Sequence, residues 1–167
     1  MNEAHYHLVV NHFPIMGTIF GLGILIAGMV FKKNSLQITA YVLFCIAAIA
    51  GFLSMNTGEG AEDLVENLPS VGHTIIHEHE EIAEKFAVIV YALAGFSLLT
   101  MYLQAKKSSF AKMASYFTLL LALIAAFIGK GVGTTGGEIR HTEIRTTVNA
   151  TSTNTTEQAP IREADED

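Results

Sequence analysis

Residues 14–31 read PIMGTIFGLGILIAGMVF, an uncharged apolar run that is followed directly by Lys32 and Lys33. A helix that spans a bilayer needs about 20 consecutive, mainly apolar residues. The proline at the start is compatible with a helix, because its missing N–H would have no partner in the first turn. This stretch therefore predicts a transmembrane helix.

Three more apolar runs follow in the 167-residue chain, half of which is hydrophobic. A soluble domain of this size rarely holds four such stretches. The sequence thus predicts an all-α integral membrane domain over residues 1–145. The expected spans are residues 14–31, 36–55, 82–103 and 110–128, with a stop at Asn56-Thr57-Gly58 and a structural turn in the glycine run 129–137.

The charged residues divide the connections between these runs into two kinds. The first and third links, with Lys112, hold five lysines and no carboxylate, whereas the 56–85 connection holds eight carboxylates and only Lys85. Cytoplasmic loops collect Lys and Arg, and short links make neighbouring helices antiparallel. We therefore expect an up-down-up-down bundle in the cell inner (cytoplasmic) membrane, with both termini extracytoplasmic.

All seven histidines fall on the side of the bundle that lacks the lysine links. Imidazole is the commonest metal ligand among side chains, so this gathering favours a single site over scattered surface residues. If the third helix begins near Val71, His73, His77 and Glu81 share one face, and His79 points the other way, to solvent. The seven are His5, His7, His12, His73, His77, His79 and His141.

The histidines next to the spans predict a haem b site. His12 precedes the first span, His77 precedes the third and His141 follows the fourth, so antiparallel packing places them at a similar depth. Two imidazoles at matched depth, with glycines making room for the porphyrin, can hold a haem. His12 and His77 are the first choice of axial ligands, and His141 or His73 would replace one of them. The expected cofactor-binding set is His7, His12, His73, His77, His141 and Arg140, the last as a partner for a haem propionate.

The same residues carry a family resemblance. His7-x4-His12-Phe-Pro-Ile, a glycine-rich span and a late Gly-x-x-Gly-Gly resemble the bacterial four-helix membrane family known as domain of unknown function 2231, over roughly residues 5–145. That family usually has proline where Leu8 stands and histidine where Thr134 stands. The resemblance implies a four-span architecture and a haem or redox role, and it supplies no established activity.

A second hypothesis is a colourless metal-binding or metal-sensing site for Zn²⁺, Cu²⁺ or Ni²⁺ at the extracytoplasmic face. Glu138-x-x-His141 has the spacing found in carboxylate-bridged di-metal sites, although the chain has no second copy. The candidate metal ligands are His12, His73, His77, His79, His141, Glu81 and Glu138.

A third hypothesis is a structural or assembly subunit. The sequence has no Ser-His-Asp array, nucleotide fingerprint or HExxH, so we do not expect catalysis in its own right. The expected partners are the lipid bilayer and a redox protein, without nucleic acid. The spacing Gly17-xxx-Gly21 would permit a homodimer. The threonine-rich, finally acidic residues 146–167 predict a disordered tail.

Overall fold

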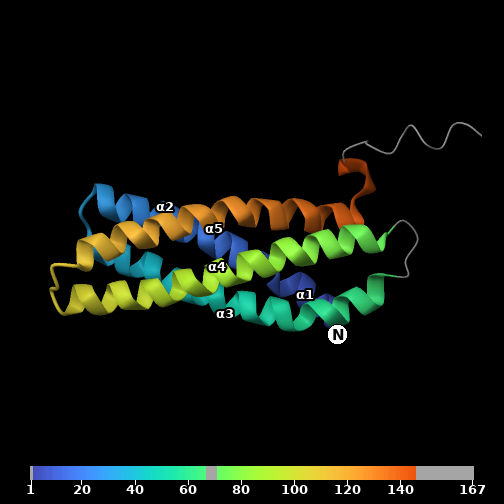
Figure 1. The fold of residues 1–167 in the computed structure, drawn as a ribbon, viewed down its shortest axis with the longest axis horizontal. Helices are drawn as coiled ribbons and strands as arrows, with labels where there is room; N and C mark the ends of the chain where they lie inside the picture. Colours follow the sequence, from blue (N-terminus) through green and yellow to red (C-terminus); the bar gives the residue numbers. More distant parts are fainter. Residues whose placement is uncertain (1, 67–70, 146–167) are drawn as a thin grey trace, which may run out of the picture.

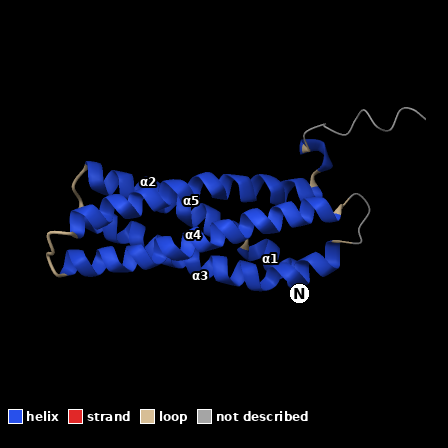
Figure 2. Ribbon diagram, in the orientation of Figure 1, coloured by secondary structure: helices blue, strands red, loops and turns tan. Residues whose placement is uncertain are grey.

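A computed structural model describes residues 2–66 and 71–145, so the predicted tail at 146–167 lies outside the described residues. Over the described ranges the chain is helical and has no strand (Figures 1 and 2). The elements are α1 (Glu3–Val10), α2 (His12–Val30), α3 (Asn34–Val65), α4 (His73–Ala105), α5 (Ala111–Arg140) and a short 3-10 turn, η1 (Thr142–Ile144).

The long helices lie side by side in one bundle (Figure 1). The links that follow α2 and α4 lie at one end, which we call the lysine end. The other end, which we call the histidine end, holds α1, the end of α3, the start of α4 and the end of α5. Four segments are long and apolar enough to cross a membrane, α1 and α2 counting as one, and this confirms the prediction of four candidate spans.

Large apolar side chains cover the outside of the bundle, whereas many interior positions are small or polar. Phe127 is 81% exposed and Phe20 is 58% exposed. Such a surface is unfavourable in water but not against lipid tails, which are as apolar as the side chains themselves. The pattern fits a membrane bundle. Fully buried hydroxyl side chains among the described residues include Thr18, Ser97, Thr100 and Thr118.

The middle of the bundle is also free of charge. Residues 13–31, 34–58, 86–105 and 113–129 contain no Asp, Glu, Lys, Arg or His. In the four long helices, the charged residues and histidines are therefore confined to the two ends of the bundle. Proton transfer or metal binding by these residue types has to take place there.

α3 is longer than predicted, because the expected stop at Asn56-Thr57-Gly58 is wrong. The Asn56 Nδ2 and Thr57 Oγ1 atoms donate to carbonyl oxygens four residues back, at 2.8 and 3.0 Å, and the helix continues to Val65. These side chains therefore bond to their own helix and do not end it. Gly58 and Gly60 lie where the His7 and Glu3 side chains of α1 approach α3.

α5 likewise continues to Arg140, so the structural turn predicted for 129–137 is wrong. Three glycines of this run, Gly129, Gly131 and Gly136, face bulky side chains of α4. A Cβ at Gly129 would lie 3.0 Å from Phe86 Cε2, and one at Gly136 would lie 3.0 Å from His79 Cε1. The glycines allow helices to pack closely, and the room at Gly129 is already filled by Phe86.

Gly17 and Gly21 face another helix of the same chain. A Cβ at Gly17 would lie 3.0 Å from Ala47 Cβ, and one at Gly21 would lie 2.5 Å from Phe44 Cε1. These glycines allow α2 to approach α3 closely. They do not form the exposed dimer face that the spacing predicted, and the homodimer itself stays a prediction.

A break at Asn11 separates α1 from α2 and shapes the histidine end. Pro14 has no N–H for the carbonyl of Val10, four residues earlier, and its ring crowds that carbonyl. α1 therefore ends at Val10, and it packs against α3. This arrangement places His7 beside Ser54 of α3.

A histidine-lined cavity as the candidate functional site

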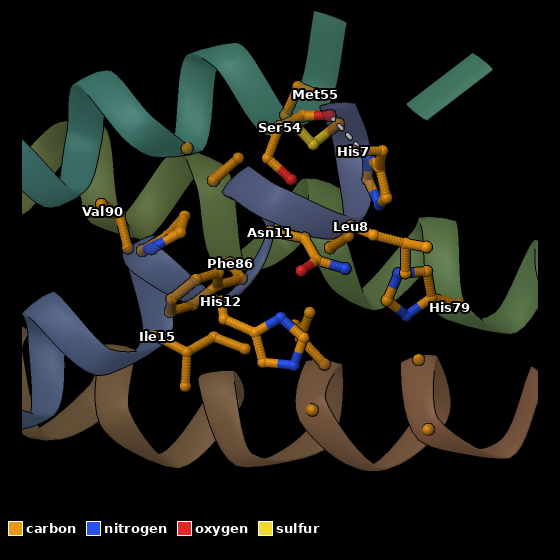
Figure 3. A pocket seen from close by; sticks show the side chains of 18 of the residues that line it. His7, Leu8, Asn11, His12, Ile15, Ser54, Met55, His79, Phe86 and Val90 are labelled. Atoms are coloured by element: carbon orange, nitrogen blue, oxygen red, sulfur yellow. Dashed lines mark hydrogen bonds between the residues drawn. The ribbon is translucent and has the colours of Figure 1, made fainter. Parts of the chain in front are cut away.

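A cavity of about 300 Å³ lies at the histidine end, among all five α-helices (Figure 3). Apolar side chains such as Ile15, Phe86 and Val90 form its deeper wall. Figure 3 shows the rings of His7, His12 and His79 around it, each from a different helix. The polar residues that line it are His7, Asn11, His12, Ser54, His79, Arg140 and His141.

The half-buried ring of His7 is held by α3. Its Nδ1 atom lies 3.1 Å from the carbonyl oxygen of Ser54 and 3.3 Å from Thr57 Oγ1. A carbonyl can only accept a hydrogen bond, so Nδ1 is the protonated nitrogen. In the neutral ring the Nε2 atom then keeps its lone pair for a ligand.

The half-buried ring of His79 is held in the same way by α5. Its Nδ1 atom lies 3.0 Å from Thr135 Oγ1, and that hydroxyl donates to the carbonyl of Gly131 at 3.1 Å. Because a hydroxyl has one proton to donate, Thr135 accepts from His79 Nδ1–H. The Nε2 atom of His79 is again left for a ligand. The expectation that His79 faces solvent is wrong.

Asn11 and His12, at the helix break, also line the cavity. Unlike the rings of His7 and His79, the ring of His12 is not held by a described hydrogen bond to another helix. Asn11 Oδ1 is buried and has no hydrogen-bond partner among the described residues. His12 is exposed overall, but its ring lines the cavity near Ile15 (Figure 3). His12 thus reaches the predicted site, although no described contact holds its ring in one tautomer.

Several predicted ligands on α4 lie away from the cavity. The side chain of His77 is 81% exposed, 4.0 Å from Glu80, and that of His73 is 77% exposed, 4.0 Å from Glu66. Glu81 is exposed and bonded to Lys85 at 2.8 Å. The face that carries His73, His77 and Glu81 is therefore a solvated acidic surface.

Of the three site residues predicted at the end of α5, two line the cavity and one does not. Arg140 and His141 line the cavity, and His141 Nδ1 lies 2.8 Å from Glu143 Oε1. Glu138 does not line it, and its carbonyl accepts a hydrogen bond from Arg145 Nε. The Glu-x-x-His pair is therefore not brought together as a metal site. In the described part of the chain no group of three His, Cys, Asp or Glu side chains is placed to hold a metal ion.

His79 was expected to face solvent, although the apolar periodicity of α4 contains the signal that it faces the other helices. Ile76, Ala83, Phe86 and Val90 repeat at intervals of three, four and seven, and His79 falls in that series. The prediction was based on Glu81 instead, which lies on the exposed face with His73 and His77. Ser54 and Thr135 could not be found from spacing, because they come from other helices.

The chain was compared with protein-family models, curated proteins and solved structures, and none of them matches it.

Proposed function

We propose that this protein is a b-type haem protein of the membrane, serving as an electron carrier or redox partner subunit, with His7 and His79 as the axial ligands. One observation carries the proposal. Two histidines from α1 and α4 each donate Nδ1–H to an acceptor on a neighbouring helix, and both residues line the same cavity. Such an outer hydrogen bond fixes the tautomer and orientation of a metal-bound histidine.

The chemistry of the donor set favours haem over a bare metal ion. A six-coordinate haem needs only two protein ligands, whereas structural zinc sites use four and catalytic ones three. No cluster of three was found over the described residues. When bound, haem supplies one-electron oxidation and reduction. Its propionates would be paired by Arg140, and Gly133 lines the cavity on the α5 side, where a Cβ would meet only Ile15 Cδ1, at 3.9 Å.

The ligand pair differs in part from the pair predicted from sequence. His77 is replaced by His79 because His77 is almost entirely exposed. His12 is replaced by His7 because the ring of His7 is held by α3. His12 remains beside the haem and, with Arg140, fits the role of a contact to a propionate or to the porphyrin edge.

The proposed setting is an up-down-up-down bundle in the inner membrane with the histidine end extracytoplasmic. The lysine links support this orientation, since positive loops stay in the cytoplasm. Membership of the domain of unknown function 2231 family belongs to the same proposal. It is supported by the placement of His7, His12 and the Gly136-Gly137 pair around one cavity.

The deciding experiment is a reduced-minus-oxidised visible spectrum of the purified protein, expressed with haem precursor supplied. We expect a sharp α band that is lost in His7→Ala and in His79→Ala. His73→Ala and His77→Ala are the matched controls, and they should keep the full band. A featureless wild-type spectrum, or a band that survives both cavity substitutions, would refute the proposal.

A further inference from the structure

A second cavity, of about 630 Å³, adjoins the first and extends from it along the end of α3 and the start of α4. The two share lining residues such as His7 and His79, whereas only the second one reaches Val65, Ile76 and Ile139. We call it the outer cavity below. A cavity with mainly apolar walls is typical of a site for a small organic molecule, in which a few polar groups orient the ligand.

The charged groups of the outer cavity are mostly negative. Among the described residues that line it are four carboxylates, in two pairs from different helices. Glu59 and Glu62 lie three residues apart on α3, so they share one face of that helix. Glu80 and Glu84 lie four residues apart on α4 and likewise share one face. Against them the described lining has one cationic side chain, that of Arg140. This excess of negative charge favours a cationic ligand.

The four carboxylates have no lysine or arginine partner in the described part of the chain. Glu80 lies 4.0 Å from the ring of the exposed His77. On its other side, Glu80 forms a side-chain hydrogen bond with Glu62, so carboxyl groups of α3 and α4 are in contact. Two ionised carboxylates this close repel each other. A cation bound against them would offset that repulsion.

An organic cation fits this cavity better than a metal ion. A metal ion such as Ca²⁺ needs about six to eight oxygen ligands at short distances, whereas an ammonium group needs only negative charge nearby. In the described ranges no group of three His, Cys, Asp or Glu side chains is placed to hold a metal ion. A metal ion would also leave the apolar walls uncovered.

We propose that the outer cavity binds an amphiphilic organic cation, a molecule with an apolar body and an ammonium group. The ammonium group would lie against the carboxylates of α3 and α4. The apolar body would lie against Val65, Ile76 and Ile139, on three different helices. Binding would require no haem, because neither these apolar side chains nor the carboxylates belong to the proposed haem ligands.

Three ligands test the chemistry of the cavity with the wild-type chain. Equilibrium dialysis of the purified protein in nanodiscs of zwitterionic lipid measures the binding of radiolabelled benzyltrimethylammonium. Tetramethylammonium, which has the charge without the apolar body, and benzenesulfonate, which has a similar body with the opposite charge, are added as competitors.

Three substitutions test the position of the site. Glu62→Gln and Glu84→Gln each remove one negative charge from the cavity wall, on different helices, and keep the size of the side chain. Glu78→Gln is the matched control, because it removes the same charge from an exposed position of α4 that does not line the cavity.

We expect saturable binding of benzyltrimethylammonium that weakens by about tenfold in each cavity variant, as for the loss of one nearby charge. Binding to Glu78→Gln should be unchanged. Tetramethylammonium should compete more weakly than unlabelled benzyltrimethylammonium by about tenfold, because it covers no apolar wall. Benzenesulfonate should not compete.

Absence of saturable binding, equal affinities of Glu62→Gln and Glu78→Gln, or displacement by benzenesulfonate would overturn the proposal. Equal competition by tetramethylammonium would overturn the role of the apolar walls, and displacement by an equal concentration of Ca²⁺ would show a metal ion site instead. The ligand series uses the wild-type chain, so it decides the proposal even if a variant fails to fold.

Discussion

The two ends of the bundle both gather polar side chains, but they use them differently. At the lysine end, Tyr41 donates to Ser115 Oγ at 3.1 Å, Gln104 Nε2 donates to Gln37 Oε1 at 3.0 Å, and Gln37 Nε2 donates to the Gly28 carbonyl at 3.2 Å. These groups bond to one another across four helices. At the histidine end, the polar side chains surround a cavity.

Each end also holds one buried oxygen without a partner among the described residues, Gln104 Oε1 and Asn11 Oδ1. The oxygen of Gln104 belongs to a side chain whose nitrogen is fully engaged with protein groups. The Asn11 side chain lines two cavities, although its oxygen is itself buried. Polarity alone therefore does not identify a binding site, and what distinguishes the histidine end is the cavity that its polar side chains line. Substitutions at the histidine end should weaken ligand binding, and those at the lysine end should weaken folding.

The largest effect is expected for Thr135→Val, which removes the acceptor of His79 Nδ1–H. Loss of an outer-shell partner typically lowers metal affinity by about 10- to 100-fold. We expect that loss in haem affinity, measured by titration of the haem-free protein. Thr134→Val is the matched control, because Thr134 is exposed and donates only to its own helix. Equal affinities for the two variants would contradict the assignment of His79 as a ligand.

A smaller effect is expected for Gly136→Ala. The added Cβ would lie 3.0 Å from His79 Cε1, so the ring has to move by a few tenths of an ångström. We expect haem affinity to fall by about tenfold or less, because ligand geometry and orientation set metal affinity. The control is Gly95→Ala, where a Cβ meets nothing within 4 Å. A shift in the α band without loss of affinity would show that the ring adapts.

Substitutions at the lysine end should lower the free energy of unfolding and leave haem affinity unchanged. Tyr41→Phe removes one buried hydroxyl and its bond to Ser115, which should lower the free energy of unfolding by about 1 kcal/mol. Unfolding in mixed detergent micelles measures it, and haem affinity should be unchanged. Tyr102→Phe is the control, since that ring is 59% exposed. A loss of haem affinity in Tyr41→Phe would show that the two ends are coupled.

The smallest effect concerns Glu143, just beyond α5. A hydrogen bond from its own backbone N–H, and then one from His141, hold the pKa of its carboxyl below the usual value. The ionised Glu143 carboxylate therefore stabilises the folded state slightly at neutral pH. This contribution is lost as the pH falls through the folded-state pKa. His141→Ala should raise this pKa only in part, because the backbone bond remains. A carboxyl ¹³C NMR titration measures it, with His5→Ala as control, and an unchanged pKa in His141→Ala would contradict the pairing.

The sequence predicted the four candidate spans well, because long apolar runs leave a chain few other stable structures. It predicted the helix ends badly. Gly58 and Gly129 were treated as signals for a stop, yet both lie within helices that place them against side chains of a neighbour. Glycine has the same local propensity in both settings, and only the packing partner distinguishes them.

The cavity lies at the end of the bundle where the sequence predicted a site, but the face of α4 that lines it is not the predicted one. His77 and His79 are two residues apart, which places them on roughly opposite sides of a helix. Choosing between them requires knowing which side faces the other helices. The apolar series through Ile76 and Phe86 gives that information, whereas the unpaired oxygen of Asn11 depends on contacts that no local pattern encodes.

The uncharged middle of the bundle has a consequence for the direction of proton movement. The stretches without ionised side chains are 17 residues long or more, roughly 25–30 Å at 1.5 Å per residue, close to the hydrocarbon thickness of a bilayer. In a membrane, protons exchanged at the histidine end would therefore equilibrate with one aqueous compartment only. The redox potential of such a site would follow the pH of that compartment, and the protein could pass electrons without short-circuiting a proton gradient.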